Sequence, residues 1–295
     1  MLLVCIHFTN QVEIVKKILA YLFMICGTAA VFFDGILPSC VLFALSLIGY
    51  ISMPFFTQAL VDGFFLTRNT YKYLLRIAFT AYLSQAVLLF IYVMWNKSPQ
   101  PDRLNIVFSY LIAFFVLYGA ELLVSLPRDR VASLNLLEPN QSSHSTRFGF
   151  VISSTDENNL PKGMKVPAWP RTTLHALAIV LFAVCMTLLT FLPLTMSLLT
   201  VMSTLLFYFL HRWKIDNRVL VATIFYSAFA ACYTYIYFRM TSTITWQAVS
   251  ILGFLLCLLI PGKRRKKSAR FYRALYLAYP LTIGICAAFA ALLLR

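Results

Sequence analysis

The sequence predicts an all-α fold, a polytopic bundle of about nine transmembrane helices that forms a single membrane domain over residues 1–295. Composition is the first reason, since 61% of the residues are hydrophobic and 12% are charged, whereas a soluble domain is about half apolar and about a quarter charged. The second reason is that apolar runs long enough to cross about 30 Å of hydrocarbon recur along the chain. The third is that Lys and Arg residues gather in alternate connections.

Each predicted span is an apolar run bounded by polar or turn-forming residues. In chain order the spans are Ile18–Phe33, Leu37–Phe65, Leu74–Trp95, Leu104–Val124, Leu174–Leu192, Leu194–Leu210, Val219–Phe238, Ile244–Ile260 and Ala274–Leu294. Open sheets are excluded, because each unpaired backbone group in lipid costs several kcal/mol. Pro193 lacks an N–H and can either turn the chain or kink one long helix. Since the segment 174–210 is too long for one crossing, the sequence favours a turn.

The basic residues predict the orientation, because loops rich in Lys and Arg stay on the cytoplasmic side. With the N-terminus inside, 21 of the 25 basic residues fall in inner segments and the C-terminus lies outside. The basic residues of the outer segments are Lys97, Arg103, Arg239 and Arg295. This topology explains the net charge of +15 without a nucleic acid partner, since the charges are spread over many loops. The run Lys263–Lys267 can also bind anionic lipid headgroups.

Motifs of soluble enzymes and of metal sites are missing from the sequence. The 7 cysteines have no metal-ligand spacing, so no metal site is predicted, and the chain has no phosphate-binding loop. None of the 4 histidines lies near the middle of a predicted span, and His175 and His211 fall at the inner membrane edge. The one sizeable hydrophilic segment is the cytoplasmic loop 125–173, which is either a plain connection or a lid or partner-binding element.

Charged residues cluster where the second predicted span ends and the third begins. Asp62 lies one turn before the inner end of its span, Arg68 and Lys72 follow it, and Arg76 enters the next helix. Pro54 is expected to interrupt or kink the helix that carries Asp62. Ionisable residues next to spans are costly and are therefore functional candidates. The structural alternative is an ion pair of Asp62 with Arg68 or Arg76 that locks two helices together.

Short motifs lie in and around this cluster, and other short motifs lie near the C-terminus. Over residues 15–125 they are Pro54-Phe55-Phe56, Asp62-Gly63-Phe64, Thr67-Arg68-Asn69, Lys72-Tyr73-Leu74-Leu75-Arg76, Ser84-Gln85 and Asn105-Ile106-Val107-Phe108-Ser109. Over residues 260–290 they are Gly262-Lys263-Arg264 and Leu275-Tyr276-Leu277-Ala278-Tyr279-Pro280-Leu281. Together they resemble the TraX family, membrane proteins associated with N-acetylation of F-type conjugative pilin. The matching residues with expected structural roles are Pro54, Thr67, Asn69, Tyr279 and Pro280.

The resemblance breaks where the family carries acids and histidines inside the membrane. The family's Asp-His pair in the first span becomes Gly27-Thr28, its D-Y-G falls near Thr195-Met196-Ser197, and its Y-P-x-H ends in Thr282. Thr28 and Thr282 can form hydrogen bonds but cannot act as the base that acetyl transfer to an amine requires. The chemistry is therefore either absent or carried by other residues.

The resemblance implies a multi-pass acyltransferase of the bacterial inner (plasma) membrane that moves an acetyl group from acetyl-CoA to a pilin-like protein. Asp62 is then the candidate base or orienting acid, and Arg68, Lys72 and Arg76 are candidates for binding the CoA phosphates. The alternative is a non-catalytic scaffold or assembly component of a conjugation or pilus-type system, with the loop 125–173 binding a partner. A transporter is a weaker third reading, because no inverted repeat is visible.

Reporter fusions or cysteine accessibility can test the predicted topology. We expect His144 and Lys266 to be cytoplasmic and Asp102 to be outside, because this assignment puts most basic residues on the inner side. A reporter at Lys266 that faced outward would show that the span count is wrong, most simply at Pro193.

Overall fold

The computed structural model is helical throughout its described residues. These are 2–67, 69–95, 105–125, 171–191, 197–212, 218–242, 245–260 and 269–293, and every structural statement below concerns them. They form nine α-helices and one 3-10 helix, with no strand among them. Most of the loop 125–173 lies outside the described residues. So do Arg68, Pro193 and the positions proposed for reporter fusions, Asp102, His144 and Lys266.

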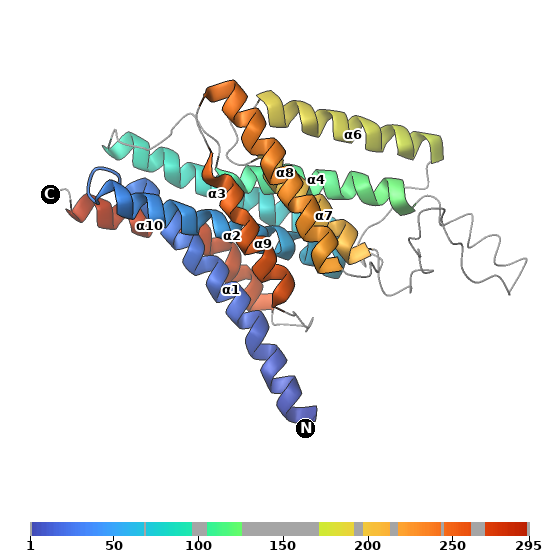
Figure 1. The fold of residues 1–295 in the computed structure, drawn as a ribbon, viewed down its shortest axis with the longest axis horizontal. Helices are drawn as coiled ribbons and strands as arrows, with labels where there is room; N and C mark the ends of the chain where they lie inside the picture. Colours follow the sequence, from blue (N-terminus) through green and yellow to red (C-terminus); the bar gives the residue numbers. More distant parts are fainter. Residues whose placement is uncertain are drawn as a thin grey trace, which may run out of the picture.

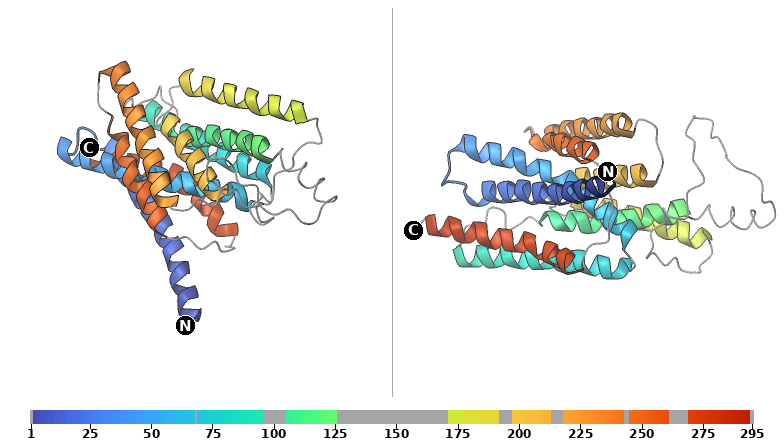
Figure 2. Two further views of the ribbon diagram at one scale, coloured as in Figure 1. Left: turned by 45° about the vertical axis from the view of Figure 1, so that its right-hand side comes forward. Right: turned by 90° about the horizontal axis from the view of Figure 1, so that it is seen from below.

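The helices follow the predicted spans in order. They are α1 (Leu2–Phe32), α2 (Ser39–Leu66), α3 (Thr70–Trp95), α4 (Ile106–Ser125), α6 (Arg171–Phe191), α7 (Ser197–Arg212), α8 (Arg218–Thr241), the 3-10 helix η2 (Trp246–Val249), α9 (Ser250–Leu259) and α10 (Ala269–Leu293). Figure 1 shows α6 lying along α4, and Figure 2 shows α10 beside α3. The N-terminal part of α1 projects away from the bundle in both figures.

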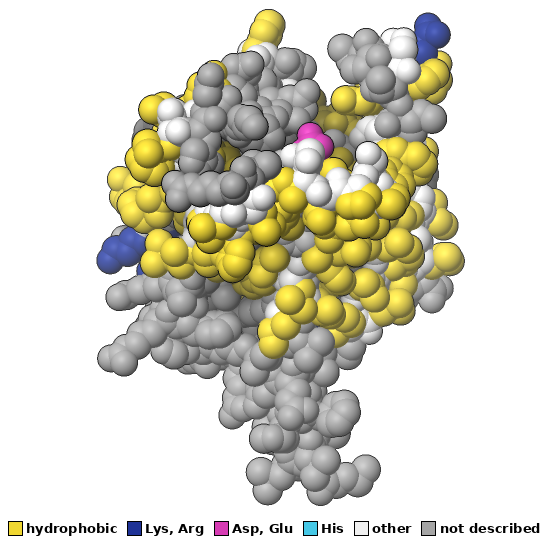
Figure 3. Space-filling model, turned by 90° about the vertical axis from the view of Figure 1, so that its left-hand side faces the viewer, with side chains coloured by type: hydrophobic (Ala, Val, Ile, Leu, Met, Phe, Trp, Pro, Cys, Tyr) yellow, Lys and Arg dark blue, Asp and Glu magenta, His cyan; other side chains and the backbone are white. Residues whose placement is uncertain are grey.

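Five of the described helices, α2, α3, α4, α6 and α8, are long and apolar enough to cross a membrane. Shorter apolar segments occur in α1, in α7, in η2 with α9, and in α10. Large apolar side chains are exposed on several helices, among them Phe79 and Phe90 of α3, Ile179 of α6 and Leu281 of α10. Figure 3 shows apolar side chains covering much of one face. An apolar exterior of this extent is what helices in contact with lipid require.

The helix boundaries can be compared with the predicted spans at two places, between α6 and α7 and in the segment 244–260. α6 ends at Phe191 and α7 begins at Ser197, on either side of residues 192–196; the turn expected at Pro193 lies outside the described residues. The predicted span 244–260 contains only the 4 residues of η2 and the 10 residues of α9. By the rise per residue of the two helix types they measure about 23 Å together, which is less than the roughly 30 Å of a hydrocarbon core.

α2 is the central helix of the bundle, in contact with α1, α3, α4, α7, η2 and α9. Glycines allow two neighbours to approach its backbone closely. A Cβ atom on Gly27 of α1 would lie 2.9 Å from the Cα of Gly49 in α2. A Cβ atom on Gly253 of α9 would collide with the carbonyl oxygen of Ile51 in α2. Small residues at such crossings are typical of membrane helices, because the backbones then pack in direct contact.

α2 continues through Pro54, so the interruption expected at this residue does not occur. Hydroxyl groups tie the neighbouring helices to α2 beside the proline. The carbonyl of Met53 accepts a hydrogen bond from Thr57 Oγ1 at 2.6 Å and one from Tyr110 Oη of α4 at 3.4 Å. Ser203 Oγ of α7 donates to Thr57 Oγ1 at 3.5 Å. Pro54 itself is buried at this point of contact between α2, α4 and α7.

The substitution Gly27→Ala is expected to destabilise the protein by about 1–3 kcal/mol, because the added methyl group meets the backbone of α2 and the helices must move apart. The matched control is Gly284→Ala in α10, where no atom lies within 4 Å of the added Cβ. Thermal unfolding in detergent should show a lower Tm for the first variant only. An unchanged Tm for Gly27→Ala would contradict the close packing of α1 on α2.

Candidate functional site

The segment 62–76 forms the end of α2, a short turn and the start of α3, at the end of the bundle that the basic residues predict to be cytoplasmic. Gly63 faces Tyr73, whose hydroxyl would collide with a Cβ atom at this position. Tyr73 Oη donates to the Leu60 carbonyl at 3.3 Å. Phe64 is fully buried and makes an edge contact with Phe114 of α4. These contacts hold α3 and α4 against α2 and leave Asp62 at the rim.

Side-chain hydrogen bonds shape the turn between α2 and α3. Asn69 caps α3, because its Oδ1 accepts a hydrogen bond from the N–H of Lys72 at 3.0 Å. Thr67 Oγ1 donates to the Asn69 carbonyl at 3.2 Å, and the Thr67 N–H donates to the Gly63 carbonyl at 3.0 Å. Both residues thus hold the chain where it reverses direction.

Lys72 and Arg76 are exposed and lie one turn apart on the outer face of α3. Tyr73 and Ile77 occupy the opposite, buried side of the same turns. The two basic side chains therefore lie at the surface, near the end of the bundle that holds Asp62, and are accessible to an anionic ligand.

Asp62 lies next to a histidine from a helix far away in the sequence. His211, in the last turn of α7, places Nδ1 3.7 Å from Asp62 Oδ1. The histidine side chain is 9% exposed and that of Asp62 is 40% exposed. This distance is in the range of an ion pair and is longer than a hydrogen bond. A carboxylate beside Nδ1 orients an imidazole so that Nε2 is the nitrogen that exchanges a proton with a substrate.

This geometry differs from the expected ion pair of Asp62 with Arg76. In the described part of the chain Asp62 pairs with His211, while Arg76 is exposed on α3. The cause is the helical phase of α3, which turns Tyr73 and Ile77 toward the core and Arg76 outward. The other expected partner, Arg68, lies outside the described residues.

A buried lysine of the neighbouring helix α1 contacts α2 one turn before Asp62. Lys16 Nζ of α1 donates to the Cys257 carbonyl at 2.8 Å and to Gln58 Oε1 at 3.3 Å. Gln58 precedes Asp62 by one turn on the same face of α2. Cys257 is in the last turn of α9, whose final carbonyls have no partner within the helix. The ammonium group therefore satisfies the end of α9 and its dipole, and it places a positive charge one turn from Asp62.

A second acid, Glu121 of α4, is buried against the end of α7. Its Oε1 lies 3.4 Å from Arg212 Nη2, and its Oε2 accepts a hydrogen bond from Tyr208 Oη at 2.6 Å. The side chains of Glu121 and Arg212 are 1% and 3% exposed. Removing one partner of a buried ion pair leaves an uncompensated charge in a low dielectric, so each residue requires the other.

The sequence does not predict a site role for Lys16, Gln58, Glu121, His211 or Arg212. One of them had a usable signal: Glu121 is the only charged residue in the apolar run 106–125, and an acid within a span marks a functional candidate. Lys16 and Arg212 have no such signal, because topology alone places basic residues at the inner ends of spans.

Three positions at which the resemblance breaks are packing positions in the structure. Gly27 lies against Gly49, where a side chain does not fit. Thr28 and Thr282 each donate to the carbonyl one turn earlier in their own helix, at 2.9 and 2.8 Å. These positions contribute no base, so the imidazole beside a carboxylate in the described residues is that of His211.

Other residues that carry the resemblance form structural contacts away from Asp62. Asn105 Nδ2 donates to the Ala81 carbonyl at 3.0 Å and to Gln85 Oε1 at 3.1 Å, which ties the start of α4 to α3. Pro280 is buried within α10, and Tyr279 packs against the main core.

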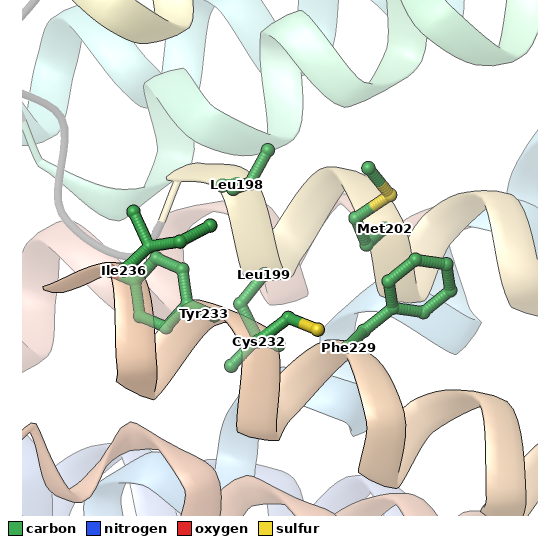
Figure 4. A pocket seen from close by; sticks show the side chains of 7 residues that line it. All are labelled: Leu198, Leu199, Met202, Phe229, Cys232, Tyr233 and Ile236. Carbon is green, nitrogen blue, oxygen red and sulfur yellow. The ribbon is translucent and has the colours of Figure 1, made fainter.

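An apolar hollow of about 150 Å³ lies between α7 and α8, well away from His211. Figure 4 shows its lining residues, Leu198, Leu199, Met202, Phe229, Cys232, Tyr233 and Ile236. They have no charged side chain, and those of α7 precede His211 by more than two turns. Among the described residues no group of three or more His, Cys, Asp or Glu could hold a metal ion. The candidate site is therefore the cluster of Asp62, His211 and Lys16.

Comparisons of the chain with protein-family models, with curated proteins and with solved structures find no match.

The buried ion pair at the end of α7 is expected to be essential for stability. Arg212→Met alone should lower the free energy of unfolding by about 3–5 kcal/mol, because Glu121 keeps its charge without a partner. The double variant Glu121→Gln with Arg212→Met should recover part of that loss, and Asp34→Asn, an exposed acid in the turn after α1, should have no effect. The measurement is unfolding in detergent. Equal losses in the single and double variants would contradict a coupled pair.

Proposed function

We propose that the chain is a TraX-like acyltransferase of the bacterial inner (plasma) membrane that acetylates the N-terminus of a pilin-like protein from acetyl-CoA. In this proposal nine spans leave the N-terminus in the cytoplasm and the C-terminus outside. The observation that supports it most is the 3.7 Å contact between Asp62 and His211, since it provides a carboxylate and an imidazole at one rim of the bundle. The basic residues predict that this rim faces the cytoplasm, where acetyl-CoA is available.

The proposed reaction uses His211 as the general base. Nε2 of the imidazole takes a proton from the acceptor amine while the amine nitrogen attacks the thioester carbonyl. A nitrogen–carbon bond forms, the carbon–sulfur bond breaks, and the CoA thiolate receives the proton from the imidazolium. Asp62 stabilises the imidazolium and holds its orientation. Lys16 contacts Gln58, one turn before Asp62, and its positive charge favours binding of an anionic acyl donor near this rim.

The basic residues of α3 are the proposed binding site for the CoA phosphates. Lys72 and Arg76 are exposed on one face of α3, close to the turn that follows Asp62. Arg68 belongs to the same proposed site on sequence grounds. Guanidinium groups suit this task, because they bind phosphate oxygens through two parallel hydrogen bonds.

His211 also accounts for the lost family positions. Gly27 and Thr28 are packing residues of α1, so an acid and a base there would require different helix contacts. Asp62 of α2 and His211 of α7 supply the same two chemical groups from other helices. In this proposal the chemistry has moved to a new pair of residues and has not disappeared.

A non-catalytic scaffold or assembly component is the second candidate. It is favoured by the nearby Glu121–Arg212 pair, which is fully buried and joins α4 to α7. If the Asp62–His211 contact likewise only joins two helices, α2 and α7, the charged rim stabilises the bundle and has no catalytic role. The loop 125–173 would then be the element that binds a partner.

Turnover of acetyl-CoA by the purified protein, with a pilin-type N-terminal peptide as acceptor, tests the proposal. His211→Gln and Asp62→Asn should each lower kcat about a hundredfold or more, as expected for loss of a general base or of its orientation. Lys72→Gln with Arg76→Gln should mainly raise KM for acetyl-CoA. The matched control is His175→Gln in α6, which should retain activity.

Two results would overturn the acyltransferase. The first is no detectable binding of acetyl-CoA by well-folded protein. The second is turnover that His211→Gln and Asp62→Asn leave unchanged. A scaffold predicts the first result together with an intact partner interaction that depends on the loop 125–173.

A further inference from the structure

Glu121 has a place in the structure that the proposed reaction does not use. It contacts two residues of α7, Tyr208 and Arg212, which lie one turn apart and on either side of His211 in the sequence. Burying a carboxylate in a membrane helix is costly, and a hydrophobic residue would normally pack there at lower cost. This cost implies that Glu121 has a role other than packing.

The ring of Phe65 connects this contact to the histidine. Phe65 of α2 stacks on His211 with ring centres 4.1 Å apart and planes 16° apart. It also stacks on Tyr208, at 5.7 Å and 19°. Phe65 is thus nearly parallel to both rings, and we call these three rings the ring stack. Because Glu121 holds the hydroxyl of Tyr208 at 2.6 Å, it acts on the imidazole through the contacts that Phe65 makes with both rings.

We propose that Glu121 is a positioning residue for His211. Through Tyr208 it holds the ring stack, and through Arg212 it holds the last turn of α7, so that Nδ1 of His211 faces Asp62. The inference rests on the proposed function for its catalytic consequence only, because the orientation of His211 can be measured without turnover. Glu121 touches neither of the proposed substrates in this arrangement and acts on the reaction through the histidine.

The test is the rate at which diethyl pyrocarbonate modifies His211 in the full-length protein in detergent, followed by mass spectrometry of its peptide. Tyr208→Phe keeps the ring but removes the hydrogen bond to Glu121, and it should raise the modification rate roughly threefold or more, the factor expected for loss of one net hydrogen bond. Glu121→Gln and Phe65→Leu should raise it as well. The matched control is Tyr226→Phe, which removes a buried tyrosine hydroxyl bonded to Ser250 and should leave His211 unchanged.

In turnover, Tyr208→Phe should lower kcat without changing KM for acetyl-CoA, and Glu121→Asp should restore part of the activity lost in Glu121→Gln. Wild-type modification rates in both Tyr208→Phe and Phe65→Leu would overturn the positioning role. If Glu121→Gln fails to fold, Tyr208→Phe and Phe65→Leu still decide. Faster modification in a protein with no turnover would support the positioning role while the acyltransferase fails, so the two proposals are separable.

Discussion

Direct backbone contact of α1 and α9 with α2 is the constraint on which the candidate site depends. Gly27 meets Gly49 on one side of α2, and Gly253 meets Ile51 on another. With larger residues at these crossings, the three helices would be held farther apart. Their close spacing allows the single side chain of Lys16 to reach both Gln58 of α2 and the Cys257 carbonyl of α9. The charged rim is therefore a result of glycine packing deeper in the bundle.

The helices were predictable because a lipid environment favours helical backbone in every apolar segment. A chain in lipid must satisfy its backbone groups within each crossing, so apolar runs become helices and their ends become visible in the sequence. The extent of α1 and the shortness of α9 were not predictable in this way. The projecting start of α1 is too polar to be read as a span, and apolar character alone does not show that the segment 246–259 begins as the 3-10 helix η2 before α9.

The site was predictable in part. Asp62 stood out as an acid near the end of a span, but its partner His211 comes from another helix and could not be paired with it from sequence spacing. Of its two expected partners, Arg76 is turned outward by the phase of α3, and Arg68 lies outside the described residues. Periodicity predicts which face of a helix is buried, whereas contacts between faces of distant helices depend on the packing of the whole bundle.

If the segment 244–260 crosses the membrane, as the sequence predicts, the short length of η2 and α9 leads to hydrophobic mismatch. A segment of about 23 Å cannot match roughly 30 Å of acyl chains, so either the bilayer becomes thinner beside it or polar chain and water enter at its ends. The carbonyl end of α9 is the end that contacts Lys16, close to Asp62. Either adjustment brings the aqueous phase nearer to these charges. Under the function proposed above, this shortens the path of water-soluble acetyl-CoA to Asp62 and His211.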